Sequence, residues 1–248
     1  MSPDSEKSKT SLNGRTVLVT GANGGLGEQF VLQAIERGAS KVYAATRTSR
    51  EWPDPRIRPL KLDITSEDDV RAAVVVARDV DLLINNAAIA PQGDSLLGSE
   101  DEARRIFETN FFGTLRVANA FAPTLGANGG GTMLNILSSA VWVSMPTTYA
   151  ASKAAMWSAT NGLRFALEAQ NTKVVSLHVG MIDTKMAAQY NVPKISPASV
   201  VTQAYDGIAA GDIEVLADDQ TRQLKSSLGT KAEQFYPWLH EQLRAFIV

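Results

Sequence analysis

Short apolar runs, rich in β-branched residues, alternate with helix-like stretches along the chain. Seven runs are typical of buried strands, and they cover residues 16–19, 42–45, 60–63, 82–84, 133–137, 174–177 and 213–216. Helical spacing of apolar positions falls between them, at residues 25–37, 66–78, 101–122 and 149–169. Ser66 is suited to cap the second helix, with Asp69 three residues further on. This alternation predicts an α/β fold, a doubly wound parallel sheet of seven strands with helices on both faces.

The chain is expected to form one domain. It has 248 residues, and no repeat or low-complexity tract divides it. Residues 1–11 are polar and mixed in charge, so we expect a flexible tail there and the domain over residues 12–248. Residues 185–197 contain Pro193 and Pro197 in a polar stretch, which indicates either a mobile lid over a substrate or an ordinary surface connection.

Composition excludes several classes of function. The formal net charge of −2 provides no positive field for nucleic acid or an anionic membrane, and no apolar run approaches membrane-spanning length. With no cysteine and only His178 and His240 as imidazoles, far apart in sequence, we expect no metal site and no disulfide. The missing cysteines leave the compartment open and are compatible with the cytoplasmic location that we expect.

A glycine-rich loop follows the first apolar run, and a helix pattern begins directly after it. Glycines let the backbone turn sharply and approach a pyrophosphate, and the free N–H groups of a helix start attract negative charge. A glycine cluster can also be a simple turn, but in an open parallel sheet this place binds a dinucleotide, as in a Rossmann fold. We expect cofactor contacts from Gly21, Asn23, Gly24, Gly25, Leu26 and Gly27.

The end of the second run bears on the choice of dinucleotide. An NAD site usually places a carboxylate there, about 20 residues past the glycines. This chain has Thr46 and Arg47 at that place and no acidic residue between Lys41 and Arg50. The guanidinium of Arg47 suits a 2′-phosphate, although it could also be an ordinary surface arginine. NADP(H) is therefore the preferred cofactor, with NAD(H) as the alternative.

A second cluster, Tyr149-Ala-Ala-Ser-Lys153, opens the helix pattern that follows the fifth run. Its ends lie one helical turn apart on one face. A nearby ammonium favours the phenolate, so we expect Lys153 to lower the pKa of Tyr149 and tune it for proton transfer. Ser138 and Ser139 end the preceding run, where a hydroxyl can hydrogen-bond the reacting oxygen.

With these motifs in this order, residues 13–217 resemble the short-chain dehydrogenase/reductase family. The resemblance implies that Tyr149 is the acid/base, that Lys153 also holds the nicotinamide ribose, that Ser138 orients the substrate oxygen, and that Asn110 relays protons. Further contacts implied with the cofactor are Asp63 and Ile64 at the adenine, Asn86 and Ala87 at the adenosine ribose, and Gly180, Ile182 and Thr184 at the carboxamide. The family also implies a homotetramer or homodimer.

The chain departs from the family pattern at three places. Ala88 stands where the family usually has glycine, and Val179 replaces the proline of its Pro-Gly pair, which leaves that backbone less restricted. The stretch between the strand end and Tyr149 is short, so either Ser138 or Ser139 fits the serine position. Counting three residues on from Asn135 selects Ser138.

Apolar and aromatic residues cluster near these motifs and are the candidates for a substrate wall, unless they are core: Trp142, Val143, Met145, Met181, Met186 and Tyr190. They predict a carbonyl reductase or alcohol dehydrogenase for a hydrophobic ketone, aldehyde or secondary alcohol. A dinucleotide-sensing regulator without turnover and a sugar-nucleotide epimerase or dehydratase are the alternatives. Residues 231–248 are apolar enough to pack on the body or on another subunit.

Overall fold

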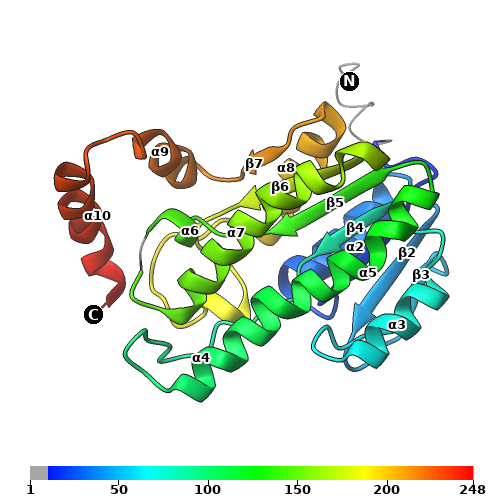
Figure 1. Ribbon diagram of the computed structural model, residues 1–248, viewed down its shortest axis with the longest axis horizontal. Coiled ribbons are helices and arrows are strands. Elements are labelled where there is room, and N and C mark those ends of the chain that lie inside the picture. Colours follow the sequence, from blue (N-terminus) through cyan, green and yellow to red (C-terminus); the bar gives the residue numbers. More distant parts are fainter. Residues whose placement is uncertain (1–10, 144, 248) are drawn as a thin grey trace.

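A seven-stranded parallel sheet forms the centre of the molecule (Figure 1). The computed structural model of the protein describes residues 11–143 and 145–247, so the predicted tail lies outside it except for Ser11. The strand order is β3-β2-β1-β4-β5-β6-β7. The bounds are β1 (Thr16–Thr20), β2 (Lys41–Thr46), β3 (Ile57–Lys61), β4 (Leu82–Asn85), β5 (Gly131–Ile136), β6 (Thr172–His178) and β7 (Glu214–Leu216). The predicted doubly wound sheet is confirmed.

Helices cover both faces of this sheet because successive strand residues point to opposite sides. Val17 and Val19 pack in one core with helices α2 (Gly25–Glu36) and α8 (Pro197–Ala210). Leu18 packs in the other core, with residues of α3, α5 and α7. The bounds of these three helices are α3 (Glu67–Val76), α5 (Thr114–Ala127) and α7 (Thr148–Ala166). Both faces are buried, which explains why the strands read as almost continuous apolar runs.

The predicted element boundaries were wrong at two places. The third strand runs over residues 57–61, not 60–63, and it includes Pro59, which an edge strand tolerates. The predicted helix 101–122 is longer and is not uniform: α4 (Glu100–Phe107) passes through a π-helical turn, η1 (Glu108–Gly113), into α5. Such turns are frequent at functional sites, and Asn110 lies in this one.

The carboxyl ends of β1 and β4 form the switch point of the sheet. The chain passes from β1 to β2 and β3 on one side, then returns to pair β4 with β1 and continues to β7 on the other. A crevice opens where the order reverses. The loop after β1 and the segment after β4 therefore face each other, and the structure has placed both predicted dinucleotide segments at one edge.

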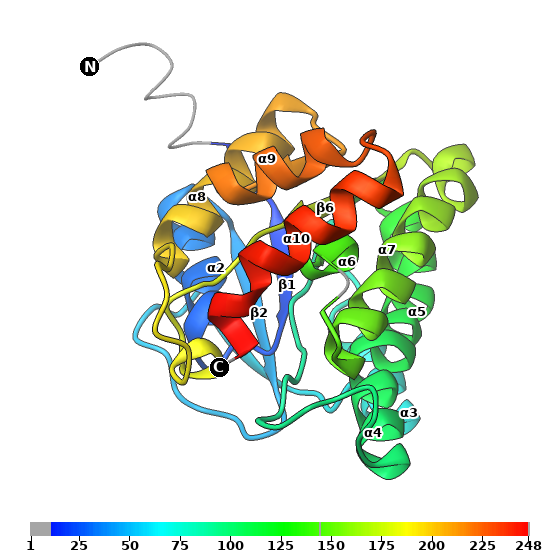
Figure 2. The same cartoon turned by 90° about the vertical axis from the view of Figure 1, so that its left-hand side faces the viewer.

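The last elements lie off the carboxyl ends of β5 and β6 (Figures 1 and 2). Helices α9 (Asp219–Ser227) and α10 (Ala232–Ile247) pack on the short helix α6 (Ala140–Val143). Leu224, Phe235, Leu239 and Leu243 form this apolar cluster with Trp142 and Val143. The sequence left open whether the carboxyl-terminal stretch packs on the body of the chain or on another subunit. Helix α10 packs on the body of the same chain. No described helix is both long enough and apolar enough to cross a bilayer.

The remaining short elements are η2 (Glu168–Gln170) and η3 (Lys185–Ala187). The segment predicted as a lid begins with η3 and is closed at its base by a bridge between Ile182 and Ile195. Pro197 is the first residue of α8, so the loop within this segment ends at Ser196. A mobile lid over residues 185–197 stays a prediction.

Candidate active site

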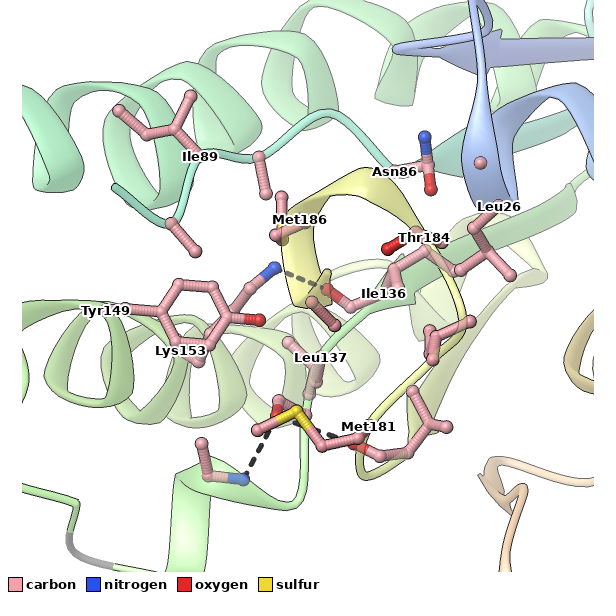
Figure 3. A pocket seen from close by; sticks show the side chains of 18 of the residues that line it. Leu26, Asn86, Ile89, Ile136, Leu137, Tyr149, Lys153, Met181, Thr184 and Met186 are labelled. Carbon is pink, nitrogen blue, oxygen red and sulfur yellow. Dashed lines mark hydrogen bonds between the residues drawn. The ribbon is translucent and has the colours of Figure 1, made fainter. Parts of the chain in front are cut away.

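One large cavity, about 1330 Å³, lies at the carboxyl edge of the sheet. Its wall contains every predicted site residue except Asn110: Gly21, Asn23, Gly24, Gly25, Leu26, Gly27, Arg47, Asp63, Ile64, Asn86, Ala87, Ser138, Tyr149, Lys153, Gly180, Ile182 and Thr184. Segments more than 150 residues apart in sequence thus meet around one space. Figure 3 shows part of this wall, with Tyr149 and Lys153 projecting from α7.

The glycine loop has the shape that a pyrophosphate requires. Gly21 and Gly25 have φ values of 69° and 53°, which favour glycine. Gly24 is the N-cap of α2 and provides no side-chain cap, so the first N–H groups of the helix remain available to an anion. A Cβ on Gly24 would have no atom within 4 Å, whereas a Cβ on Gly27 would overlap the Gly21 carbonyl oxygen. The loop is open toward the cavity and tightly packed behind, and it fits a dinucleotide.

Asn86 holds this loop from the other side of the switch point. Its Nδ2 donates hydrogen bonds to the carbonyl oxygens of Thr20 (2.9 Å) and Gly21 (3.2 Å). The Thr20 hydroxyl in turn accepts from the backbone N–H groups of Asn86 and Ala87, at 3.0 and 3.1 Å. The side-chain amide of Asn86 is thus engaged with the loop and shapes it, and Asn86 also lines the cavity. Its contact with a cofactor stays a prediction.

Arg47 lies exposed at the adenosine end of the cavity. No acidic side chain within residues 11–143 or 145–247 accepts a hydrogen bond from it. The charge of Arg47 acts on Asp63, which also lines the cavity. Burial acts to raise the pKa of Asp63, but hydrogen bonds from Thr65 and the charges of Arg47 and Lys61 bring it below its usual value. The Arg47 guanidinium is available to an anionic group of a ligand.

Tyr149 and Lys153 extend from the first turns of α7 into the cavity (Figure 3). Lys153 is buried, and its Nζ donates a hydrogen bond to the carbonyl oxygen of Ile136 at 2.9 Å. Burial lowers the pKa of Lys153 to about 8 and raises the pKa of Tyr149 to about 12. The expected lowering of the Tyr149 pKa is therefore wrong for this structure, because desolvation outweighs the ammonium, which lies 5.8 Å from the ring centroid.

Ser138 is the serine whose hydroxyl affects the phenol, because it acts to lower the pKa of Tyr149, against the effect of burial. The Ser138 hydroxyl accepts from the Ala140 N–H (3.1 Å) and donates to the Val179 carbonyl oxygen (3.4 Å). Ser139 instead donates its backbone N–H to Val179, at 2.9 Å. The geometry favours Ser138 as the residue that meets a substrate oxygen.

Asn110 is set back from the cavity and supports its wall. Its side chain donates to the carbonyl oxygen of Ile89 (2.9 Å) and accepts from the Ile89 N–H (2.8 Å). It also donates to the Ser152 hydroxyl at 3.1 Å, and Ser152 donates to the backbone carbonyl of Tyr149 at 2.7 Å. The side chain of Asn110 therefore fixes the loop after β4 and the start of α7, while its predicted proton relay stays a prediction.

Two aspartates that sequence reasoning missed hold these segments in place. Asp94 accepts the backbone N–H groups of Thr148 (3.1 Å) and Tyr149 (2.7 Å) at the start of α7. Asp218 accepts the backbone N–H of Gly180 at 2.7 Å. Asp218 also caps α9, a role that its position just before a helix could have indicated. No sequence signal marks Asp94, because its partners lie more than 50 residues away.

The substrate wall differs from the prediction at one residue. Val143, Met145, Met181, Met186 and Tyr190 line the cavity as expected. Trp142 does not, because its ring stacks on buried His178 at a centroid distance of 4.3 Å. Helices α9 and α10 also reach the site, which the sequence did not predict. They contribute seven residues to the wall: Gln220, Gln223, Leu224, Trp238, Leu239, Gln242 and Leu243.

Comparison with known proteins agrees with this geometry. Residues 15–194 match the family model described as short chain dehydrogenase. An uncharacterized oxidoreductase of Staphylococcus aureus strain USA300 is 29% identical over 194 residues, which cover 73% of this chain and 84% of that protein. A dehydrogenase/reductase SDR family protein 7-like of Anopheles gambiae is 31% identical, over 73% of this chain and 63% of that protein.

Among solved structures, the chain is similar to a short chain dehydrogenase from Burkholderia cenocepacia J2315, crystallised in complex with NADP. The two sequences are 34% identical, and the TM-score is 0.87 over 92% of this chain and 98% of the other. The similarity therefore extends past the family match to nearly the whole chain.

Proposed function

Because the chain belongs to the short chain dehydrogenase family, we propose that it is an NADP(H)-dependent carbonyl reductase or alcohol dehydrogenase. Its substrate is a hydrophobic ketone or aldehyde, or the corresponding alcohol. The observation that carries the proposal is that Ser138, Tyr149 and Lys153 line the wall of one cavity whose other end is the glycine loop. Proton transfer and dinucleotide binding thereby share one space.

The residues present fit an NADP(H) dinucleotide. The uncapped start of α2 and the open position at Gly24 suit the pyrophosphate. The exposed guanidinium of Arg47 suits a 2′-phosphate, which it can bind through two parallel hydrogen bonds. The similar Burkholderia cenocepacia protein was crystallised with NADP, which supports the same choice here.

The proton chemistry follows from the groups around Tyr149. When bound, the nicotinamide supplies a hydride to the carbonyl carbon, or accepts one in the reverse direction. The Ser138 hydroxyl orients the substrate oxygen, and Tyr149 gives its proton to that oxygen as the carbon is reduced. With a pKa of about 12 the phenol keeps its proton at neutral pH, so it is ready to act as the acid of the reduction.

The substrate class follows from the wall beyond Tyr149. Val143, Met145, Met181, Leu239 and Leu243 present apolar side chains there. Such a wall favours a ketone or aldehyde with an apolar body over a small charged one, because these apolar side chains cannot replace the water that a charged group would lose.

The test is cofactor-coupled turnover. Absorbance of NADPH and NADH is followed with a panel of apolar and charged ketones and aldehydes, on the parent chain and on Tyr149→Phe. We expect NADPH-dependent turnover that prefers apolar carbonyls and falls at least 100-fold in Tyr149→Phe, with NADPH binding retained. Tyr236→Phe is the matched control, since Tyr236 is exposed on α10 and does not line the cavity.

Two outcomes would contradict the proposal. Full activity in Tyr149→Phe would exclude the phenol as the acid. Tight NADPH binding without turnover on any carbonyl would favour a dinucleotide-sensing regulator instead.

A further inference from the structure

Asp218 is bonded to two separate parts of the chain. Its Oδ1 accepts the backbone N–H of Thr221 at 2.8 Å, which caps α9, and its Oδ2 accepts the Thr221 hydroxyl at 2.8 Å. The same Oδ2 accepts the backbone N–H of Gly180 at 2.7 Å, 38 residues away in sequence. A helix cap needs only the first bond, so the bond to Gly180 requires another explanation.

The two parts that Asp218 joins both border the site. On one side, α9 leads into α10, and both line the apolar substrate end of the cavity. On the other side, Gly180 begins the segment that reaches the glycine loop, since a Cβ on Gly25 would lie 3.1 Å from Thr184 Cγ2. Strands β6 and β7 pair up to His178, whose carbonyl oxygen accepts the Ala217 N–H at 2.9 Å. Just beyond this pairing, Asp218 bonds the start of α9 to the segment that borders the cofactor loop.

The bond is of a kind that holds backbone firmly. A carboxylate that accepts backbone N–H groups forms hydrogen bonds about twice as strong as neutral ones. Gly180 has no side chain to fix its position. The carbonyl oxygen of the preceding residue, Val179, already accepts the N–H of Ser139 at 2.9 Å. With the bond to Asp218, the backbone on both sides of the Val179–Gly180 peptide is restrained beside Ser138.

We propose that Asp218 is a positioning residue that fixes the Gly180 backbone to α9, so that the substrate wall and the cofactor-side segment keep one arrangement. The proposal rests on the proposed function of the site. It predicts that loss of this bond alone, with α9 still capped, weakens both dinucleotide and carbonyl binding.

The decisive variant is Asp218→Ser. Serine is a good N-cap, so its hydroxyl can take the place of Oδ1 at the Thr221 N–H, but it has no second oxygen at the Oδ2 position that the Gly180 N–H reaches. Asp218→Ala removes both bonds. Ser196→Ala is the matched control, because Ser196 caps α8 in the same way, through the Ser199 N–H, and does not line the cavity.

Five quantities are measured on each variant: the melting temperature, amide hydrogen exchange of residues 180–187, the Kd for NADPH by fluorescence titration, and the KM and kcat for an apolar ketone. For Asp218→Ser we expect a nearly native melting temperature and Gly180 exchange about tenfold faster. The NADPH Kd and the ketone KM should each rise by about 3- to 10-fold, with a smaller change in kcat. Ser196→Ala should lower the melting temperature and leave exchange and NADPH binding unchanged.

One result overturns the proposal. If Asp218→Ser has the parent's Gly180 exchange and NADPH Kd while Asp218→Ala is destabilised, the carboxylate only caps α9. The proposed function fails by a different result, the absence of carbonyl turnover in the parent chain. Exchange and NADPH binding would still report on Asp218 in that case.

Discussion

Lys153 Nζ donates a hydrogen bond to the Ile136 carbonyl oxygen at 2.9 Å, which ties helix α7 to the end of strand β5. The ammonium is thus held by the sheet, next to the phenol of Tyr149 but not bonded to it. Its burial lowers the pKa to about 8, so the folded protein carries this charge at a cost.

Replacement of Lys153 by methionine should remove activity and also change how stability depends on pH. An unfolded lysine keeps its proton up to its usual pKa of 10.5, whereas the folded one loses it near 8. Between these values the unfolded state binds more protons, so the parent should gain about 2 kcal/mol from pH 7 to pH 9.5. Urea unfolding at both pH values should show this gain in the parent and not in Lys153→Met. An equal gain in both chains would contradict the assignment.

Alanine substitutions of the two serines at the end of β5 should differ in their effect on kcat. Ser138→Ala removes the hydroxyl that interacts with Tyr149, so kcat should fall by about 100-fold. Ser139→Ala keeps the backbone bond to Val179 and should retain activity within about threefold. A loss confined to Ser139→Ala would reverse the choice between them.

Arg47→Asp should change the preferred dinucleotide. The substitution removes a cation and places a carboxylate near a 2′-phosphate, so the KM for NADPH should rise at least tenfold. The KM for NADH should stay the same or fall. Arg58→Asp makes the same charge change at an exposed arginine of β3 outside the cavity, and it should leave both constants unchanged. An unaltered preference in Arg47→Asp would remove the basis for choosing NADP(H).

Alanine should destabilise the protein at one glycine of the loop and leave its stability nearly unchanged at another. An alanine Cβ at position 27 would overlap the Gly21 carbonyl oxygen and lie 2.7 Å from Asn86 Nδ2, so Gly27→Ala should cost about 1–3 kcal/mol and disrupt NADPH binding. Gly24 has extended backbone and open space around it. The free energy of unfolding of Gly24→Ala should therefore lie within about 0.5 kcal/mol of the parent value. Equal free energies of unfolding for the two variants would show that the loop adjusts to the added methyl group.

Local patterns were sufficient to predict the sheet, the glycine loop and the Tyr149–Lys153 pair, because each depends on spacing within one element. The missed features depend on contacts between distant elements. Burial set the pKa of Tyr149, ring stacking with His178 took Trp142 out of the wall, and folding of the last helices brought Leu239 to the cavity. The π-helical turn at Asn110 also has no simple sequence pattern, and the predicted homotetramer or homodimer stays a prediction.

The hydrogen bonds that Asn86 donates to the Thr20 and Gly21 carbonyl oxygens have a consequence for the order of folding. These partners lie 65 and 66 residues apart, so the glycine loop cannot acquire its shape from local contacts. Contacts of such separation form late, after the entropy of closing a long loop has been overcome. A fragment that ends before β4 should therefore contain the glycine motif and still not bind a dinucleotide. The cofactor would bind only after β1 and β4 have paired, and it would stabilise the finished sheet by mass action rather than start its assembly.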